Sequence, residues 1–116
     1  MELKIKDVIG MRCITKDDGQ KIYNIIHPEL LNNKTVILNF QGVMQFASPF
    51  FNFAIGQLLK DLSVKDLKRL LEIKNFVPDG RLVVNRVIEN ASKYHQDVNY
   101  RNIVDSILEQ QAAEAE

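Results

Sequence analysis

One run of apolar and β-branched residues, Thr35–Phe40, stands out near the middle of the chain because it lacks the alternation of apolar and polar positions typical of a half-exposed strand. Such runs are typical of strands that are covered on both faces, as in the middle of an α/β sheet. We therefore predict a central strand, with Val36, Leu38 and Phe40 on one covered face and Ile37 on the other.

A serine–proline pair marks the start of the next predicted helix. Gln41-Gly42 ends the strand, and Ser48-Pro49 precedes apolar residues with helical spacing, namely Phe51, Ile55, Leu58, Leu59 and Leu62. Serine is a preferred capping residue and proline suits the first helical position, so Ser48 is the predicted cap and Pro49 begins the helix. Ligands and partners of open α/β sheets usually meet where strands end and helices begin, which makes this loop the candidate functional region.

The amino-terminal third predicts an edge strand and a capped helix. Leu3 and Ile5 alternate with charged residues, as in a half-exposed strand. The next stretch, Asp7–Cys13, fits either an extension of that strand or a second strand. Thr15 is followed three positions later by an aspartate, a capping-box-like start, and we expect the helix to end or kink near Pro28.

The remaining pattern predicts one more strand and two helices. Ser63–Asp66 is interpreted as a polar link, and Arg69–Phe76 as a strand parallel to the central one. Asp79 is the predicted cap of a helix over Arg81–Tyr94. Asn99–Glu116 has the pattern of a last helix whose end frays. No repeat or linker divides the chain, so residues 1–116 are predicted to form one domain.

Composition narrows the function classes. The 116 residues carry 15 basic and 15 acidic side chains, which argues against a general nucleic-acid binder. Cys13 is the only cysteine, so no internal disulfide is expected, in keeping with a reducing cytoplasm. No apolar run is long enough for a membrane span, and the amino end lacks a signal-peptide core. We therefore expect a cytoplasmic protein.

The stretch L-N-F-Q-G-V followed by Ser48 resembles the signature of STAS domains, which include the anti-sigma factor antagonists. In that resemblance Asn39 takes the place of a strand aspartate, Gly42-Val43 matches the glycine–valine pair, and Ser48 matches the serine that antagonists have phosphorylated. The chain departs from the antagonist pattern at Ala47, where antagonists have aspartate, and at Pro49-Phe50, where they have Ser-Gly.

A closer resemblance is to the STAS-like family of uncharacterised bacterial proteins. The chain resembles that family's pattern, in register, at Ser48, Phe50, Asn52, Gly56 and Leu58. Thr15–Gly19 also resembles the start of that family's first helix, so the resemblance extends over roughly Ile14–Tyr94. It implies a small α/β domain of STAS-like type, with a mostly parallel central sheet packed with helices and an extra carboxyl-terminal helix.

Catalytic and metal-binding motifs are not evident in the sequence. There is no phosphate-binding glycine loop, zinc-ligand spacing or nucleophile elbow, so we expect neither an enzyme nor a cofactor or metal site. Surface or helix-end positions explain His27 and His95, and Cys13 is interpreted as a small core residue.

The resemblance implies a regulatory protein-interaction module whose partner is a serine-kinase-like or histidine-kinase-like ATP-binding protein, or another signalling protein. The candidate phosphorylation site is Ser48. The candidate partner-binding residues are Gln41, Gly42, Met44, Gln45, Phe46, Ser48, Phe50, Asn52 and Phe53. The alternative is a structural or self-associating domain without a phosphoswitch, forming a homodimer through its last helix.

Overall fold

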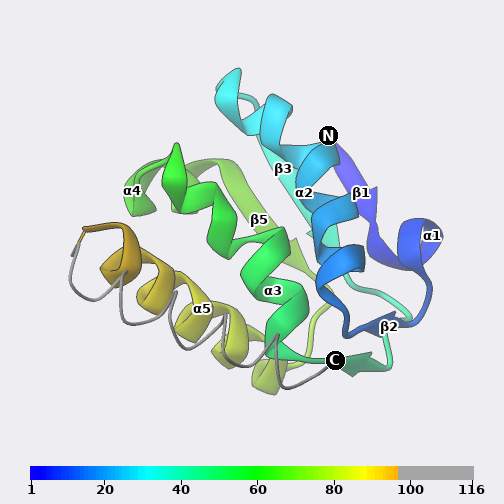
Figure 1. The fold of residues 1–116 in the computed structure, drawn as a ribbon. Coiled ribbons are helices and arrows are strands. Elements are labelled where there is room, and N and C mark those ends of the chain that lie inside the picture. Colours follow the sequence, from blue (N-terminus) through cyan, green and yellow to red (C-terminus); the bar gives the residue numbers. More distant parts are fainter. Residues whose placement is uncertain (97–116) are drawn as a thin grey trace.

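The computed structural model describes residues 1–96 and shows a three-stranded parallel sheet with its longer helices packed on one side (Figure 1). The strands are β1 (Glu2–Lys4), β3 (Val36–Asn39) and β5 (Leu71–Lys74), in the order β1-β3-β5. The central and last strands are parallel, as predicted, because a helical crossover connects them. The expected helix at Asn99–Glu116 lies outside the described residues.

The other elements connect and cover these strands. The helices are α1 (Ile5–Ile9), α2 (Lys16–Leu31), α3 (Ser48–Ala54), a 3-10 helix η1 (Gly56–Lys60), α4 (Val64–Leu70) and α5 (Pro78–Gln96). A second, two-stranded parallel ladder joins β2 (Arg12–Cys13) to β4 (Gln45–Phe46). No helix among residues 1–96 combines the length and apolar character that a membrane crossing requires.

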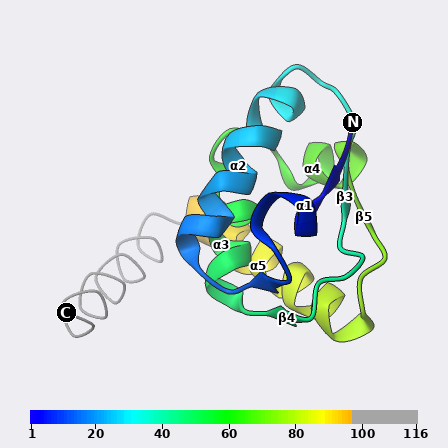
Figure 2. The ribbon, with the colours of Figure 1, turned by 90° about the vertical axis from the view of Figure 1, so that its right-hand side faces the viewer.

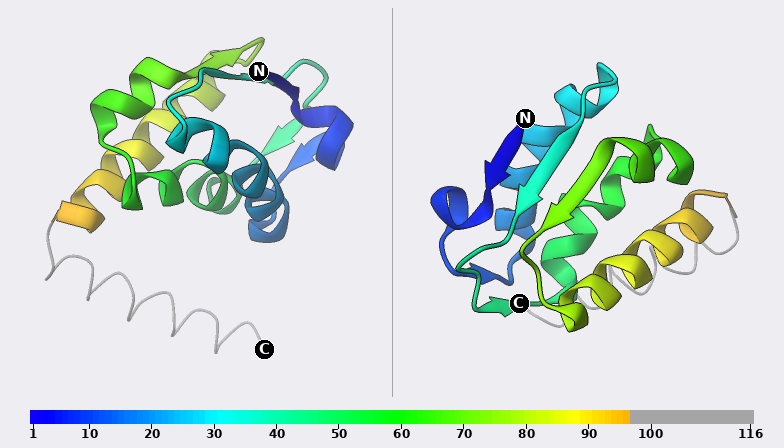
Figure 3. Two further views of the ribbon diagram at one scale, coloured as in Figure 1. Left: turned by 90° about the horizontal axis from the view of Figure 1, so that it is seen from above. Right: turned by 180° about the vertical axis from the view of Figure 1, so that it is seen from behind.

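Within residues 1–96 the sheet is covered on one face only, which contradicts the predicted burial of β3 from both sides. Figure 2 shows α2, α3, α4 and α5 on the same side of the strands, and the right-hand view of Figure 3 shows the other side of the sheet in front of them. Val36 and Leu38 face the helices and belong to the core, with Leu38 only 1% exposed. Ile37 points the other way, is half-buried and packs outside that core.

The core is formed where α2 crosses α3 beneath the sheet. Gly19 of α2 makes this close approach possible, since a Cβ at that position would lie 2.4 Å from the backbone oxygen of Phe50. Ile22, Ile26 and Leu30 extend the apolar stripe of α2 into the same core. Val84 and Val87 of α5 close it from the opposite side, as the apolar pattern of that helix predicts.

Two helices depart from their predicted extent. The predicted helix from Pro49 to Leu62 is broken at Ile55 and continues as η1, in which buried Gly56 packs against Val87 of α5. In the other direction, α2 does not end near Pro28 but continues to Leu31. The lost backbone hydrogen bond at Pro28 is outweighed because Leu30, in the turn after the proline, is buried in the core.

The start of α2 agrees with the prediction, and the starts of α4 and α5 differ from it. Thr15 caps α2 as predicted, and its hydroxyl accepts a hydrogen bond from the Asp18 N–H at 3.1 Å. Ser63 does the same for Asp66 at 3.1 Å, so the predicted polar link is the start of α4. Asp79 is not a cap, because α5 already begins at Pro78. The ambiguous stretch Asp7–Cys13 contains the end of α1 and then β2.

Candidate interaction surface

The loop after β3 is held in place by a backbone ladder before α3 begins. Gly42 has φ +84°, the left-handed conformation that favours glycine, and it turns the chain away from β3. The Met44 N–H then donates to the Met11 oxygen at 2.8 Å, and the Ala47 N–H donates to the Cys13 oxygen at 2.9 Å. These bonds fix the loop alongside β2 and set the direction in which α3 starts.

The structure places Ser48 inside α3 rather than at its cap, contrary to prediction. Ala47 occupies the cap position with φ −150° and ψ 155°, and no side-chain hydrogen bond caps this helix. The reason is the ladder: the hydrogen bond from Ala47 to Cys13 keeps Ala47 extended, so the helical turn begins one residue later. Ser48 is therefore an exposed first residue of the helix whose hydroxyl carries no capping hydrogen bond.

Seven of the nine predicted partner-binding residues are exposed in the structure. They are Gln41, Gly42, Met44, Gln45, Ser48, Asn52 and Phe53. Met44 is 75% exposed and Phe53 is 36% exposed. Phe46 is half-buried, and Phe50 is only 1% exposed, so its prediction as a surface residue is wrong. The Phe50 side chain belongs to the hydrophobic core and meets Phe51 edge-on at a centroid distance of 5.1 Å.

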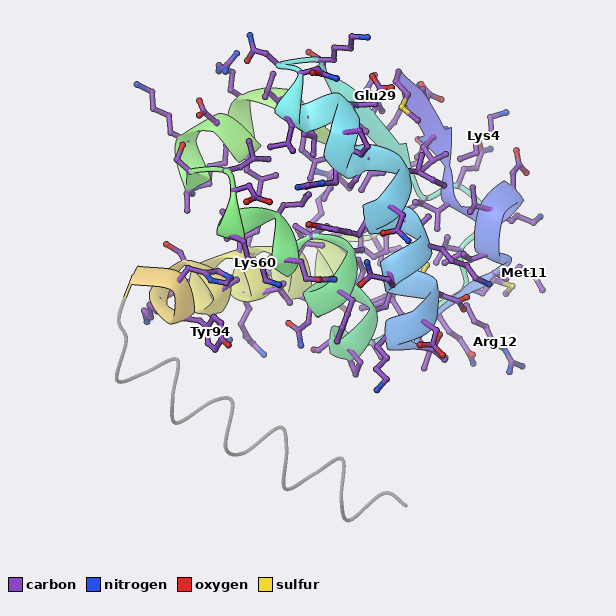
Figure 4. The ribbon with its side chains drawn as sticks, turned by 45° about the horizontal axis from the view of Figure 1, so that its top comes forward. Lys4, Met11, Arg12, Glu29, Lys60 and Tyr94 are labelled. Carbon is purple, nitrogen blue, oxygen red and sulfur yellow. The ribbon has the colours of Figure 1, made fainter. Side chains whose placement is uncertain are left out.

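Sequence interpretation missed two neighbouring apolar residues. Met11 is 48% exposed and is bonded through its backbone to Met44, and Ile14 is also exposed. Figure 4 shows the side chains of Met11 and Arg12 projecting outward near α1. The only sequence signal for them was the apolar character of a stretch whose strand assignment stayed open. We define the docking surface as Met11 together with the seven exposed residues above.

The members of the docking surface are uncharged, and two exposed basic residues border them: the Lys6 side chain lies against Gly42, and Arg12 pairs with Gln45 in the two-stranded ladder. From Thr35 to Leu59 the chain contains no aspartate, glutamate, lysine or arginine, although such residues make up 26% of the whole sequence. Every member of the docking surface except Met11 comes from this stretch, and Met11 is itself uncharged. An uncharged centre that contains exposed Met and Phe side chains, with charged residues at its border, is typical of protein interfaces.

Aromatic rings support the docking surface from below. Phe46 meets Phe76 edge-on at a centroid distance of 5.2 Å, and Phe76 stacks on Phe40 at 4.2 Å. Phe51 contacts both Phe40 and Phe46 at centroid distances of 6.1 and 6.3 Å. Ring pairs in these geometries contribute about 0.5–1.5 kcal/mol beyond their burial, so the loop rests on a rigid base.

One buried amide joins the loop to the two flanking strands. The Asn39 side chain donates to Glu2 Oε2 at 3.1 Å, and its Oδ1 accepts from the Gln41 N–H and from Asn75 Nδ2, both at 3.0 Å. The hydrogen bond from Asn39 and the nearby charge of Lys74 hold the pKa of the Glu2 carboxyl below its ordinary value. Asn39 thus fixes the position from which the loop departs.

Cys13 is buried in the core, and His27 is held by contacts with neighbouring side chains. Burial, with a further contribution from Asp18, raises the pKa of the Cys13 thiol to about 12, so the thiol stays protonated and unreactive at neutral pH. His27 contacts Asp61 at 2.8 Å and stacks on Tyr23. Among residues 1–96 no three His, Cys, Asp or Glu side chains are grouped so as to hold a metal ion.

Comparison with known families finds a match over the middle of the chain. The model of a family described as a STAS-like domain of unknown function (DUF4325) matches residues 18–81, which is more than half of the chain. The matched stretch includes the loop after β3 and all of α3, whereas Met11 precedes it. No curated protein and no solved structure matches the chain significantly.

Proposed function

The chain belongs to the STAS-like domain family, and on that basis we propose that it is a non-catalytic regulatory module that binds a protein partner through the docking surface. The observation that carries the proposal is the exposure of Met44, at 75%, within a surface that has no charged member. A large apolar side chain at the tip of a rigidly supported loop gains free energy when a partner covers it.

The resemblance to anti-sigma factor antagonists suggests the class of partner. We propose a serine-kinase-like or histidine-kinase-like ATP-binding protein, with an apolar pocket for Met44 and a polar rim facing Gln45 and Asn52. Preorganisation supports this surface as a binding site, because the backbone bonds to Met11 and Cys13 already hold the loop and little ordering is lost on docking.

A phosphoswitch at Ser48 is a second, separable part of the proposal. The Ser48 hydroxyl is exposed and makes no capping bond, so its modification would not remove a stabilising contact of α3. A phosphate would add a charge of about −1.5 to −2 to the otherwise uncharged docking surface. A partner that covers Met44 and Phe53 would then have to desolvate that charge, which favours release.

The docking surface is tested by titrating a candidate ATP-binding partner against the wild type and two variants. Met44→Glu places a charge at the centre of the docking surface and is expected to weaken binding at least about tenfold. Leu82→Glu is the matched control, because Leu82 is another apolar residue, 61% exposed, on α5. Equal losses in both variants, or none in Met44→Glu, would remove the docking surface from the proposal.

The switch is tested with Ser48→Asp and Ser48→Asn, which are close in size and differ in charge. We expect Ser48→Asn to bind like the wild type and Ser48→Asp to bind more weakly. Equal affinities of both variants and the wild type for the partner would rule out the phosphoswitch at Ser48 and would leave the proposed docking surface unaffected.

A further inference from the structure

The uncovered face of the central sheet is unusual for strands that are all parallel. Parallel sheets are normally covered on both faces by their crossover helices. Here α2, α3, α4 and α5 lie on one side, and the opposite side of β1, β3 and β5 stays open within residues 1–96 (Figures 2 and 3). Ile37 lies in the middle of this open face, half-buried and outside the core.

The strand register arranges the charges of the open face in two rows. Glu2 pairs with Ile37, which pairs with Glu72, so the first row has an acidic residue at each end. Two residues further along, Lys4 pairs with Asn39, which pairs with Lys74, so the second row has a basic residue at each end. The open face therefore has equal numbers of both charges, separated along the strand direction.

We propose that the open face binds the open face of a second copy of this chain, with the strands of the two copies antiparallel. The two-fold axis of this dimer lies in the plane of the interface, perpendicular to the strands and midway between the two rows. It places the acidic row of each copy over the basic row of the other. Glu2 then faces the partner's Lys4, and Glu72 faces the partner's Lys74. An axis along the strands would instead place like charges together, so charge alone selects the antiparallel arrangement.

Two of the four charges on the open face, those of Lys4 and Glu72, are available for such pairing, whereas Glu2 already accepts a hydrogen bond from Asn39. Within residues 1–96, Lys74 lies 3.6 Å from Glu2, whereas Lys4 and Glu72 form no ion pair. Figure 4 shows the Lys4 side chain extending away from the sheet into solvent. The lysine stems can cover Ile37 while their ammonium groups reach the carboxylates of the other copy.

The contact is small, because each copy contributes three short strands. Interfaces at the low end of the size range are weak and reversible, so association is expected at high protein concentration and should weaken as salt screens the charges. This surface is separate from the docking surface, which consists of Met11 and residues of the loop after β3 and of α3. The proposal therefore stands or falls independently of the proposed function.

The test uses the full chain and two charge-reversal variants, Glu72→Lys and Lys74→Glu. In either variant alone, positions 72 and 74 carry the same sign, so each homodimer should weaken at least about tenfold. In an equimolar mixture the two variants complement each other, and heterodimers should form with an affinity close to that of the wild type. Sedimentation equilibrium measures association, and native mass spectrometry with one variant isotope-labelled identifies the heterodimer.

Lys65→Glu is the control, since Lys65 is an exposed lysine on α4, on the helical side of the sheet, and its reversal should leave association unchanged. Thermal unfolding of each variant verifies that the fold is intact. A wild type that stays monomeric at millimolar concentration overturns the proposal. So does a dimer that is insensitive to both reversals, or that is lost only when residues 97–116 are removed.

Discussion

Asn75 donates a hydrogen bond from its side-chain amide to the side-chain oxygen of Asn39 at 3.0 Å, and this bond ties the turn after β5 to the end of β3. Asn75 has φ +58°, the left-handed conformation that asparagine adopts more readily than most residues. The same Asn39 oxygen accepts from the Gln41 N–H. One buried side chain thus positions the two loops that leave the carboxyl end of the sheet.

Asn39→Ala should therefore destabilise the fold. The substitution removes the hydrogen bonds from the Gln41 N–H and the Asn75 amide, and a hydrogen bond contributes about 0.5–1.5 kcal/mol. Urea unfolding followed by circular dichroism measures the change. Asn52→Ala is the control, because Asn52 is exposed on α3 and should change the unfolding free energy by less than about 0.5 kcal/mol. Equal effects would show that the Asn39 bonds do not stabilise the fold.

Asn39→Asp should make the fold less stable as the pH rises, which is the opposite of acid denaturation. The new carboxylate would face Glu2, whose oxygen lies 3.1 Å from the present amide nitrogen. Two facing carboxylates raise the folded-state pKa of the pair above its unfolded value, so stability is lost as pH rises through the raised pKa. In the wild type the Glu2 pKa is lowered, so its contribution is present above the unfolded pKa and is lost as pH falls.

The stability gap between Asn39→Asp and the wild type should therefore be largest near pH 7 and should narrow toward about pH 4. Denaturant unfolding at the two pH values measures it. Adding Glu2→Gln to the variant removes the facing charge and should restore most of the loss near pH 7. A gap that is constant with pH would mean that the two carboxylates do not interact.

Three hydroxyl residues at helix starts should respond differently to alanine. Thr15→Ala and Ser63→Ala each remove a side-chain cap hydrogen bond and should cost about 0.5–2 kcal/mol of unfolding free energy. Ser48→Ala removes no cap bond and should change stability by less than about 0.5 kcal/mol. Thermal or urea unfolding of the three variants side by side makes the comparison. A Ser48→Ala loss as large as the other two would restore Ser48 as a cap.

Gly19→Ala tests the close crossing of α2 and α3. Alanine is favoured over glycine inside a helix by about 1 kcal/mol, so propensity alone predicts stabilisation. The added Cβ would lie 2.4 Å from the Phe50 oxygen, a backbone atom that cannot move without shifting α3. We expect a net loss of about 1–3 kcal/mol. Gly56→Ala is the comparison, because its nearest neighbour is a Val87 side-chain carbon at 3.4 Å and the effect should be smaller.

Local sequence determined the features that depend on a few consecutive residues. The run Val36–Asn39 forms a strand because β-branched and apolar residues favour that state. The Thr15 cap follows from its spacing to Asp18, and the buried face of α5 follows from its apolar periodicity. The STAS-like resemblance rested on the same local patterns, and the family match confirms it.

The tertiary structure decided the features that depend on partners far away in the chain. Ser48 lost its cap role because Ala47 is held extended by Cys13, which lies 34 positions earlier. Pro28 stays inside α2 because the turn after it is buried in the core. Ile37 lies on an open face because, among the described residues, all four helices that cover the sheet pack on the side of Leu38. Periodicity records whether a residue is apolar, but which face of a sheet is covered depends on where the crossover helices pack.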